Sequence, residues 1–479
     1  LIAKGVGPGD VVTLQFPTWA EFCIAYVAVL KVGGVVHPVP RNYNDVDLEY
    51  AMNLIGTRAF ISPTFSHNTD YEAQILSVRD AVPTLAAIAV LDKQAPSHSD
   101  LPTFDDIYRR FEPVLEPVAV SADSVACILP TSGTTGKPKQ SMLTHNNILF
   151  SERAFTGELG RTEADVMFMP SPLNHATGFF HGLISPLLLG GRAVLQQDFR
   201  PREAIALMNA EGRHLVHVGH PVHLRHAERA GRRGRPGLRH ASPVLLRRRA
   251  SAPGAHRSAR PATTCCSARS TAPRKAARMC SCRRRSAPNG TAPGPACPFA
   301  GIEVKVIDEN GQEVPRGAQG EEISRGPHMF VGYLNERDRT DRALTDDGWF
   351  FSGDLCYMDE EGRIRINGRK KEVIIRGGEN ISAREIDDDL IGAPGLANSA
   401  TIGMPDARLG ERICTFVVPA DPAAPPTQDE LIAYLKERHV AKRLWPERIE
   451  LIDEIPVTAT GKVKRFILAQ ILKERMEAE

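Results

Sequence analysis

Apolar and polar positions alternate in blocks along the first part of the chain. Short apolar runs typical of buried strands alternate with amphipathic stretches of helix length, at 11–16 (strand), 21–33 (helix), 45–56 (helix), 59–63 (strand) and 85–91 (strand). Strands that alternate with helices favour a parallel sheet covered by helices. The chain also enters a turn and a strand directly after Leu1, which is typical of the middle of a domain. We therefore expect an α/β domain that is truncated at its N-terminus.

The pattern continues to about residue 213 and then disappears. Residues 124–130 indicate a strand, followed by a Gly/Ser/Thr-rich loop that we expect to lead into a helix. The alternation of strands and helices continues over 161–199. Between Pro221 and Gly290 there is no Phe, Tyr, Trp, Ile or Asp, so almost nothing there favours a strand. The interruption covers about 214–296.

Strand signals return after the interruption. Residues 299–322 contain an Asn-Gly turn between apolar stretches, which is typical of a β-hairpin. Beyond about residue 369, short strands alternate with helices, including the amphipathic stretch 428–440. The predicted fold is thus α/β, with a large N-terminal domain over 1–367 that holds parallel sheets and a small α+β C-terminal domain over 368–479.

Composition agrees with a globular enzyme. Hydrophobic residues make up 42% of the chain and charged residues 24%, values ordinary for a soluble domain. The most apolar run, 22–39, contains Lys31 and two glycines, so we interpret it as a buried helix that leads into a strand and predict no transmembrane segment. Nine cysteines without paired spacing outside 264–282 fit a reducing compartment, which predicts a cytoplasmic protein.

The stretch "TSGTTGKPK", Thr131–Lys139, has the chemistry of a polyphosphate cradle. Glycines let backbone N–H groups approach an anion, hydroxyls donate further hydrogen bonds, and Lys139 adds positive charge. It is not a Walker A loop, because Pro138 follows the Gly-Lys pair where that motif needs Ser or Thr. The alternative is an ordinary polar loop between a strand and a helix.

This stretch resembles the nucleotide-binding signature of the adenylate-forming superfamily, which includes acyl-CoA synthetases and peptide-synthetase adenylation domains. Further segments resemble the family in its own order: "EFCIAYVAVLKVGGVVHPVP", "PSPLNHATGFFHGLISPLLLGGRAVL", "GEEISRGPHMFVGYLNE", "DGWFFSGDL", "GRKKEVIIRGGENIS" and "PVTATGKVKR". The resemblance covers nearly all of 1–213 and 297–479. It is strongest to ligases of medium-chain or alicyclic carboxylic acids.

The resemblance implies a reaction in two halves. A carboxylic acid attacks the α-phosphorus of ATP, bound with Mg²⁺, to form an acyl-adenylate, and the thiol of coenzyme A then displaces AMP. The residues implied to hold the β- and γ-phosphates are Thr131, Ser132, Gly133, Thr134, Thr135, Gly136 and Lys139. Asp354 is implied to accept hydrogen bonds from the ribose hydroxyls, and Arg369 to contact the nucleotide. Ordinary surface roles are the alternative for Asp354 and Arg369.

Three candidates carry the rest of the implied chemistry. Lys462 would bridge the carboxylate and the α-phosphate during adenylation, and Glu379 would face the site during thioester formation. His175 would lie beside the acyl and thiol channel, with a structural role as the alternative. Lys371 falls at the interdomain hinge of the family, and no protein metal ligands are predicted. Phe179, Phe180 and Gly182 are implied to line the acyl pocket.

The resemblance also leaves departures and alternatives. Gln140 stands where the signature usually has Gly and could crowd the loop, and Pro130 stands where an aromatic residue is common. The enzyme could load a carrier protein instead of CoA. The expected partners are a small carboxylic acid and CoA, with no nucleic acid, and the oligomeric state is left open.

The family also has a "GGAP"-like adenine segment and a "YGSTE"-like motif, both of which belong between residues 214 and 296 and are absent as written. That region instead holds an Arg-rich stretch with cysteines spaced CC and CxC, which makes a poor zinc site, and a basic arm inside a catalytic domain is physically implausible. Its codons, read two bases late over 265–276, permit "LLGEVYGSTES". Read one base late, 246–256 permit "CGGAPVPPAH". A frameshift is therefore favoured over a functional insert, and an inactive nucleotide-binding relic is a further alternative.

Overall fold

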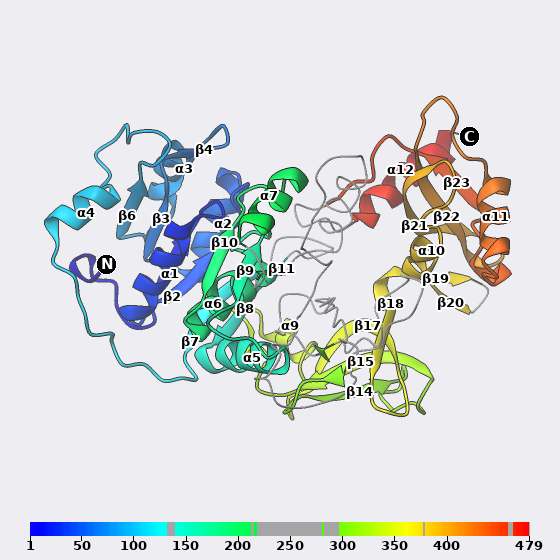
Figure 1. Ribbon diagram of the computed structural model, residues 1–479, viewed down its shortest axis with the longest axis horizontal. Coiled ribbons are helices and arrows are strands. Elements are labelled where there is room, and N and C mark those ends of the chain that lie inside the picture. The colour runs from blue at the N-terminus through cyan, green and yellow to red at the C-terminus, as the bar shows by residue number, and fades with distance from the viewer. Residues whose placement is uncertain are drawn as a thin grey trace, which may run out of the picture. The chain divides into compact units, whose positions relative to one another are not determined.

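The structure is a computed structural model of the 479-residue chain. It describes residues 1–131, 139–211, 215–217, 280–281, 297–376, 379–457 and 463–478. The chain divides into two compact units (Figure 1). Unit 1 consists of Leu1–Glu303 and Ser324–Phe350, and unit 2 of Val304–Ile323 and Phe351–Glu479. The proposed boundary of the family domains near residue 367 stays a prediction.

A seven-stranded sheet forms the centre of unit 1, in the order β16-β8-β7-β2-β1-β3-β6. Its strands are β1 (Val11–Leu14), β2 (Val35–Pro38), β3 (Ala59–Pro63), β6 (Ala87–Leu91), β7 (Val125–Thr131), β8 (Lys139–Thr144) and β16 (Gly332–Tyr333). The five strands from β7 to β6 are parallel, whereas β8 runs antiparallel to β7. The helices between them are α1 (Ala20–Lys31), α2 (Asp45–Ile55), α3 (Tyr71–Val78) and α4 (Phe104–Arg110), with the short 3₁₀ helices η1 (Ile2–Lys4) and η2 (Arg79–Ala81).

The predicted alternation of strands and helices is confirmed over this part of the chain. All four residues of β1 and of β2 are buried, as expected for parallel strands covered on both faces. The apolar run 22–39 forms α1 and then β2, as predicted. The helix expected after the Gly/Ser/Thr loop is α5 (His145–Glu158), but the strand β8 lies between the loop and this helix and was not expected. Pairing with β7 satisfies the backbone hydrogen bonds of β8 before α5 begins.

A second, fully parallel sheet of unit 1 has the order β10-β9-β11. Its strands are β9 (Val166–Met169), β10 (Arg192–Leu195) and β11 (Leu215–His217). The helices around it are α5 (His145–Glu158), the π-helix η3 (Gly178–Ile184), α6 (Ser185–Leu189) and α7 (Pro201–Glu211). The described part of the unit also has these short elements: β4 (Phe65–Ser66), β5 (Thr69–Asp70), β12 (Cys280–Ser281), β13 (Cys297–Pro298) and α9 (Arg337–Asp341).

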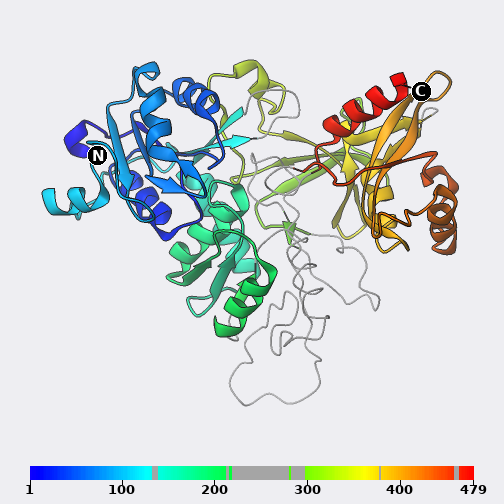
Figure 2. The same cartoon turned by 90° about the horizontal axis from the view of Figure 1, so that it is seen from above.

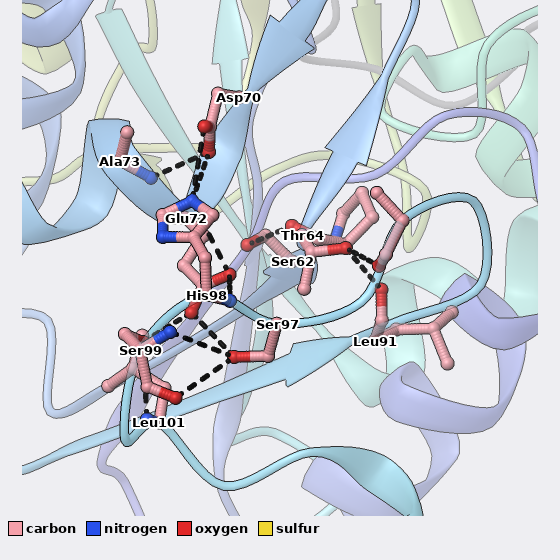
Figure 3. A network of polar contacts seen from close by, with 12 residues as sticks. Ser62, Thr64, Asp70, Glu72, Ala73, Leu91, Ser97, His98, Ser99 and Leu101 are labelled. Atoms are coloured by element: carbon pink, nitrogen blue, oxygen red, sulfur yellow. Dashed lines mark hydrogen bonds and ion pairs between the residues drawn. The ribbon is translucent and has the colours of Figure 1, made fainter.

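A buried carboxylate anchors the loop that follows β6 in unit 1 (Figure 3). The side chain of Glu72, at the start of α3, is fully buried. One carboxylate oxygen accepts hydrogen bonds from the hydroxyls of Ser97, at 2.6 Å, and Ser99. The other accepts from the backbone N–H of His98 at 3.1 Å. The imidazole of His98 in turn lies 3.1 Å from the carboxylate of Asp70, which also caps α3.

Unit 2 contains two sheets. A four-stranded sheet has the order β14-β15-β17-β18, with strands β14 (Glu303–Ile307), β15 (Gln319–Arg325), β17 (Phe350–Met358) and β18 (Ile364–Arg369). A five-stranded sheet has the order β20-β19-β22-β21, with β23 also paired to β22. Its strands are β19 (Val373–Arg376), β20 (Glu379–Ser382), β21 (Leu396–Asp406), β22 (Gly410–Pro419) and β23 (Arg448–Leu451). The helices are α10 (Ala383–Asp389), α11 (Gln428–Glu437) and α12 (Arg465–Ala478), with the 3₁₀ helices η5 (Lys370–Glu372) and η6 (Lys442–Leu444).

Both faces of the five-stranded sheet are covered, and its strand β22 shows why. Ile413 and Val417 pack in a core cluster with residues of α10 and α11. Cys414 and Phe416 pack in a second cluster with residues of α12. Because successive side chains of a strand point to opposite faces, one apolar strand serves both layers. Figure 2 shows α12 and the helices of the other layer around these strands. Within the part of the chain that the structure describes, no helix combines the length and apolarity needed to cross a bilayer.

Candidate active site

The predicted phosphate loop joins two paired strands of unit 1. Thr131, the last residue of β7, is the register partner of Lys139, the first residue of β8. Ser132, Gly133, Thr134, Thr135 and Gly136 lie outside the described residues, and so does the side chain of Thr131. The ammonium of Lys139 lies 5.2 Å from the centre of the Tyr333 ring, which is a cation–π distance. The contact with the Tyr333 ring thus holds the Lys139 side chain, at the end of the predicted phosphate loop, against the edge strand β16.

Gln140, which differs from the family glycine, points into the core of the sheet. It is 1% exposed, pairs with Pro130 and lies beside the imidazole of His37 on β2. Burial lowers the pKa of His37 to about 3, so this imidazole is neutral at physiological pH. His37 also contacts the hydroxyl of Thr13 at 3.1 Å, which in turn bonds to Thr57. The larger residue at position 140 is therefore buried within the sheet, beside the imidazole of His37.

His175 lies in a tight turn between β9 and the π-helix. Its backbone N–H donates to the carbonyl of Pro172 at 3.0 Å, and its own carbonyl accepts from Phe179 N–H at 2.8 Å. Its Nδ1 accepts a hydrogen bond from the N–H of Thr177 at 3.3 Å. Since an accepting Nδ1 carries no hydrogen in the neutral ring, the hydrogen is on Nε2. The turn thus presets the tautomer of the imidazole.

The two aromatic residues after this turn are core residues. Phe179 is fully buried and packs edge-on against Tyr26, with ring centres 5.3 Å apart. Phe180 is 4% exposed and packs edge-on against Phe179 at 5.1 Å. At Gly182 a Cβ atom would lie 2.5 Å from a side-chain carbon of Met169, so the π-helix lies directly on β9. Their part in an acyl pocket stays a prediction.

The structure brings Asp354 and Arg369 together in unit 2. They are register partners on the antiparallel strands β17 and β18, and Arg369 Nε lies 2.8 Å from Asp354 Oδ1. The Asp354 side chain is 1% exposed and that of Arg369 is 31% exposed. Two residues 15 positions apart in the sequence thus form one half-buried ion pair. Sequence reasoning gave them neighbouring roles but could not show this contact.

Local hydrogen bonds hold the backbone around Asp354. The hydroxyl of Ser352 accepts from the N–H of Asp354 at 3.0 Å and donates to the carbonyl of Glu322 at 2.7 Å. Gly353 has φ of 71°, a left-handed conformation that favours glycine, and its N–H donates to the Glu321 carboxylate at 3.1 Å. The same carboxylate lies 3.0 Å from the ammonium of Lys370. Sequence reasoning missed Glu321 and Lys370, although the charges of "GEE" and "GRKK" were visible as possible partners.

The remaining candidates are only partly described. Lys371 lies in the 3₁₀ helix η5, and Glu379 begins β20 as the register partner of Arg376, but the side chains of Lys371 and Glu379 are not described. Lys462 lies outside the described residues. Most of the predicted frameshifted segment does so too, apart from the short strands β11 and β12. The roles of these residues stay predictions.

Comparison with known proteins decides the family. The sequence profile of AMP-binding enzymes matches residues 1–334, and that of the AMP-binding enzyme C-terminal domain matches residues 385–462. The chain belongs to the AMP-binding enzyme family. The predicted membership in the adenylate-forming superfamily is therefore confirmed, and so is the prediction that the chain is an enzyme of the ligase type.

Individual relatives of this AMP-binding enzyme cover almost its whole length. The medium-chain fatty-acid–CoA ligase of Escherichia coli (strain K12) is 37% identical over 99% of the chain and 84% of the relative. The 2,3-dihydroxybenzoate-AMP ligase of Bacillus subtilis (strain 168) is 27% identical over 99% of the chain and 86% of the relative. The solved structure of ATP-bound MatB from Rhodopseudomonas palustris matches with a TM-score of 0.81 and 25% identity, over 99% of the chain and 91% of that structure. The predicted α/β fold with a large N-terminal and a small α+β C-terminal part is confirmed.

Proposed function

We propose that this AMP-binding enzyme is an ATP-dependent acid–CoA ligase for medium-chain fatty or alicyclic carboxylic acids. The observation that carries the proposal is the 37% identity to a medium-chain fatty-acid–CoA ligase over 99% of the chain. ATP, with its Mg²⁺, and CoA enter as substrates. In the first half-reaction, a carboxylate oxygen of the acid attacks the α-phosphorus, and pyrophosphate leaves. In the second, the CoA sulfur attacks the acyl carbon, and AMP leaves.

The ion pair of unit 2 supports a nucleotide-binding role. A carboxylate that is 1% exposed and held by a guanidinium at 2.8 Å is fixed in direction before a ligand arrives. Such a carboxylate suits two adjacent hydroxyls, because each can donate a hydrogen bond to it. In the proposal, Asp354 accepts from the ribose hydroxyls while Arg369 keeps Asp354 oriented and contacts the nucleotide.

The residues of unit 1 would act on the phosphates and the acid. The backbone and hydroxyls of Thr131–Gly136, with Lys139, would neutralise the β- and γ-phosphates as pyrophosphate leaves. His175 would present its Nε2–H to the reacting acyl group, because its Nδ1 is engaged by the backbone. Lys462 would neutralise charge at the α-phosphate during adenylation, and Glu379 would contribute to the thioester half-reaction.

The test measures each half-reaction separately. ATP–pyrophosphate exchange is measured with straight-chain acids of graded length and with cyclohexanecarboxylate, and thioester formation is followed as loss of the CoA thiol. We expect exchange with medium-chain or alicyclic acids and consumption of CoA with the same acids. Exchange that is confined to long-chain or aromatic acids would overturn the proposed substrate.

One alternative has an observation in its favour, the 27% identity to a 2,3-dihydroxybenzoate-AMP ligase over 99% of the chain. Exchange without any consumption of CoA would support adenylation for another acceptor, such as a carrier protein. Binding of ATP without exchange for any acid would instead support an inactive nucleotide-binding relic. The three readings therefore give different results in the same pair of assays.

A further inference from the structure

One ionisable group in the interior of unit 1 has no part in the proposed chemistry. Glu152 lies on α5, and its side chain is 1% exposed. Its Oε2 accepts a hydrogen bond from the hydroxyl of Ser185, which is fully buried. The same oxygen lies 3.1 Å from Nδ1 of His181, whose side chain is 4% exposed. When Glu152 is ionised it only accepts hydrogen bonds, so Nδ1 of His181 then carries the hydrogen.

Both donors belong to the segment that follows the His175 turn. His181 lies in the middle of the π-helix η3, and Ser185 is the first residue of α6. The ring of His181 also packs on Phe155, one helical turn after Glu152, with ring centres 4.4 Å apart. Helix α5 therefore holds the π-helix near its middle and just after its end.

Close packing at two glycines also holds this segment. At Gly178, a Cβ atom would lie 2.1 Å from the carbonyl oxygen of Pro172, and at Gly182 it would lie 2.5 Å from Met169. No larger residue fits at either position without a shift of the backbone or of Met169. The π-helix is thus fixed by close glycine contacts with Pro172 and with Met169 of β9, and by the carboxylate of Glu152 on α5.

The choice of a buried carboxylate for this contact needs a reason. Burying a charge is costly, and apolar residues of similar volume would stabilise such a contact as well or better. What a charged hydrogen-bond acceptor adds is direction, because its two donors must lie at set angles. A π-helix is a rare conformation that recurs at functional sites, so its geometry gains from contacts that specify it.

We propose that Glu152 is a positioning residue for the acid-binding side of the proposed active site. Through His181 and Ser185 it fixes the π-helix, which includes Phe180, and through the π-helix it fixes the turn that carries His175. This inference rests on the proposed function for the identity of the site, but the Glu152 clamp itself does not depend on activity. Loss of the clamp should loosen the segment 172–190 and weaken selection of the acid more than binding of ATP.

The test uses the full chain and three variants. Glu152→Gln removes the charge at similar volume, and Ser185→Ala removes one donor with little risk to folding. Glu163→Gln, an exposed glutamate in the turn after the same helix, is the matched control. Hydrogen exchange of peptides from 172–190 is measured by mass spectrometry beside peptides from α1.

We expect Glu152→Gln to raise the exchange rate in 172–190 at least tenfold and Ser185→Ala to raise it less, while α1 peptides and the Glu163→Gln control do not change. Unchanged exchange in 172–190 would overturn the clamp. A rise of similar size in α1 would do so too, because it would show general destabilisation in place of local positioning.

The second readout is the ATP–pyrophosphate exchange assay. In Glu152→Gln we expect the KM for the acid to rise at least fivefold, the KM for ATP to stay within twofold, and discrimination between acids of different length to fall. Equal changes in both KM values would overturn the positioning role. If the unsubstituted chain shows no exchange with any acid, the proposed function fails, whereas the hydrogen-exchange result still decides whether the clamp exists.

Discussion

The buried carboxylate of Glu72 gives the sharpest prediction about stability. In Glu72→Gln, the oxygen that accepts from the Ser97 and Ser99 hydroxyls can be kept, but the oxygen that accepts from the His98 N–H at 3.1 Å becomes an amide that donates. One charged hydrogen bond worth about 1.5–3 kcal/mol is lost, and two others become neutral. The free energy of local opening of this loop should therefore fall by about 2–4 kcal/mol.

Hydrogen exchange measures that opening directly, because amides exchange through local unfolding. At tenfold per 1.4 kcal/mol, the exchange rate at the start of α3 and in 97–101 should rise by about 30- to 700-fold. Glu49→Gln, an exposed glutamate on α2, is the matched control and should change nothing. An increase of less than threefold in Glu72→Gln would refute the reasoning, because it would mean that the carboxylate bonds contribute no net stability.

The pH dependence of the same loop gives an independent check. Burial would raise the pKa of Glu72, but the bonds from Ser97, Ser99 and the His98 N–H outweigh it and lower the pKa below 4.5, so the stabilisation by Glu72 is lost as pH falls through the lowered value. The hydrogen bond to Asp70 raises the pKa of His98 above 6.5, so the stabilisation by His98 is lost as pH rises through the raised value. The free energy of local opening of the loop, obtained after the exchange rates are corrected for the intrinsic pH dependence of amide exchange, should be greatest between about pH 4.5 and 6.5. A monotonic fall in stability across that window would contradict this account.

Four other outcomes are expected. Gly178→Ala would place a Cβ atom 2.1 Å from a backbone oxygen, so the urea midpoint of unit 1 should fall, with a loss of about 2 kcal/mol or more; an unchanged midpoint would show that the turn can shift freely. Arg369→Gln removes the guanidinium from Asp354 and should weaken binding of a fluorescent ATP analogue at least tenfold, whereas Arg363→Gln, another arginine of the same hairpin, should have little effect. Burial lowers the pKa of His37 to about 3, so below pH 6.5 the imidazole is protonated in the unfolded state but not in the folded state. The free energy of unfolding should therefore fall by about 2–3 kcal/mol between pH 7 and pH 4.5. In His37→Asn this pH dependence, measured by urea unfolding, should be weaker. Finally, resequencing the DNA for residues 210–300 should show single-base slips, and reads that keep the stated frame would end the frameshift hypothesis.

The sequence alone predicted the elements whose buried residues follow one clear apolar pattern. The run 22–39 predicted α1 and β2. Its apolar residues are spaced as in a helix up to Lys31, and two glycines then separate them from a valine-rich run that is typical of a buried strand. Strand β8 was missed, because "KQSML" has no strong strand pattern of its own. Its pairing with β7 and the burial of Gln140 and Leu143 decide its conformation, and both depend on a neighbour in space.

The site shows the same division. The sequence alone named Asp354, Arg369 and His175, because these residue types stand in ordered family motifs. Only the tertiary structure decided that Asp354 and Arg369 face each other across β17 and β18, since register between strands is a long-range property.

The tertiary structure also decided what no motif could indicate. In the sequence, nothing distinguishes Glu152 from the other charged residues of its helix. Only the folded structure shows that His181 and Ser185 contact its carboxylate. Residue type and spacing determine which chemistry a chain can perform. Which groups are desolvated and which partners they meet is determined by packing, because burial and distance exist only in the folded chain.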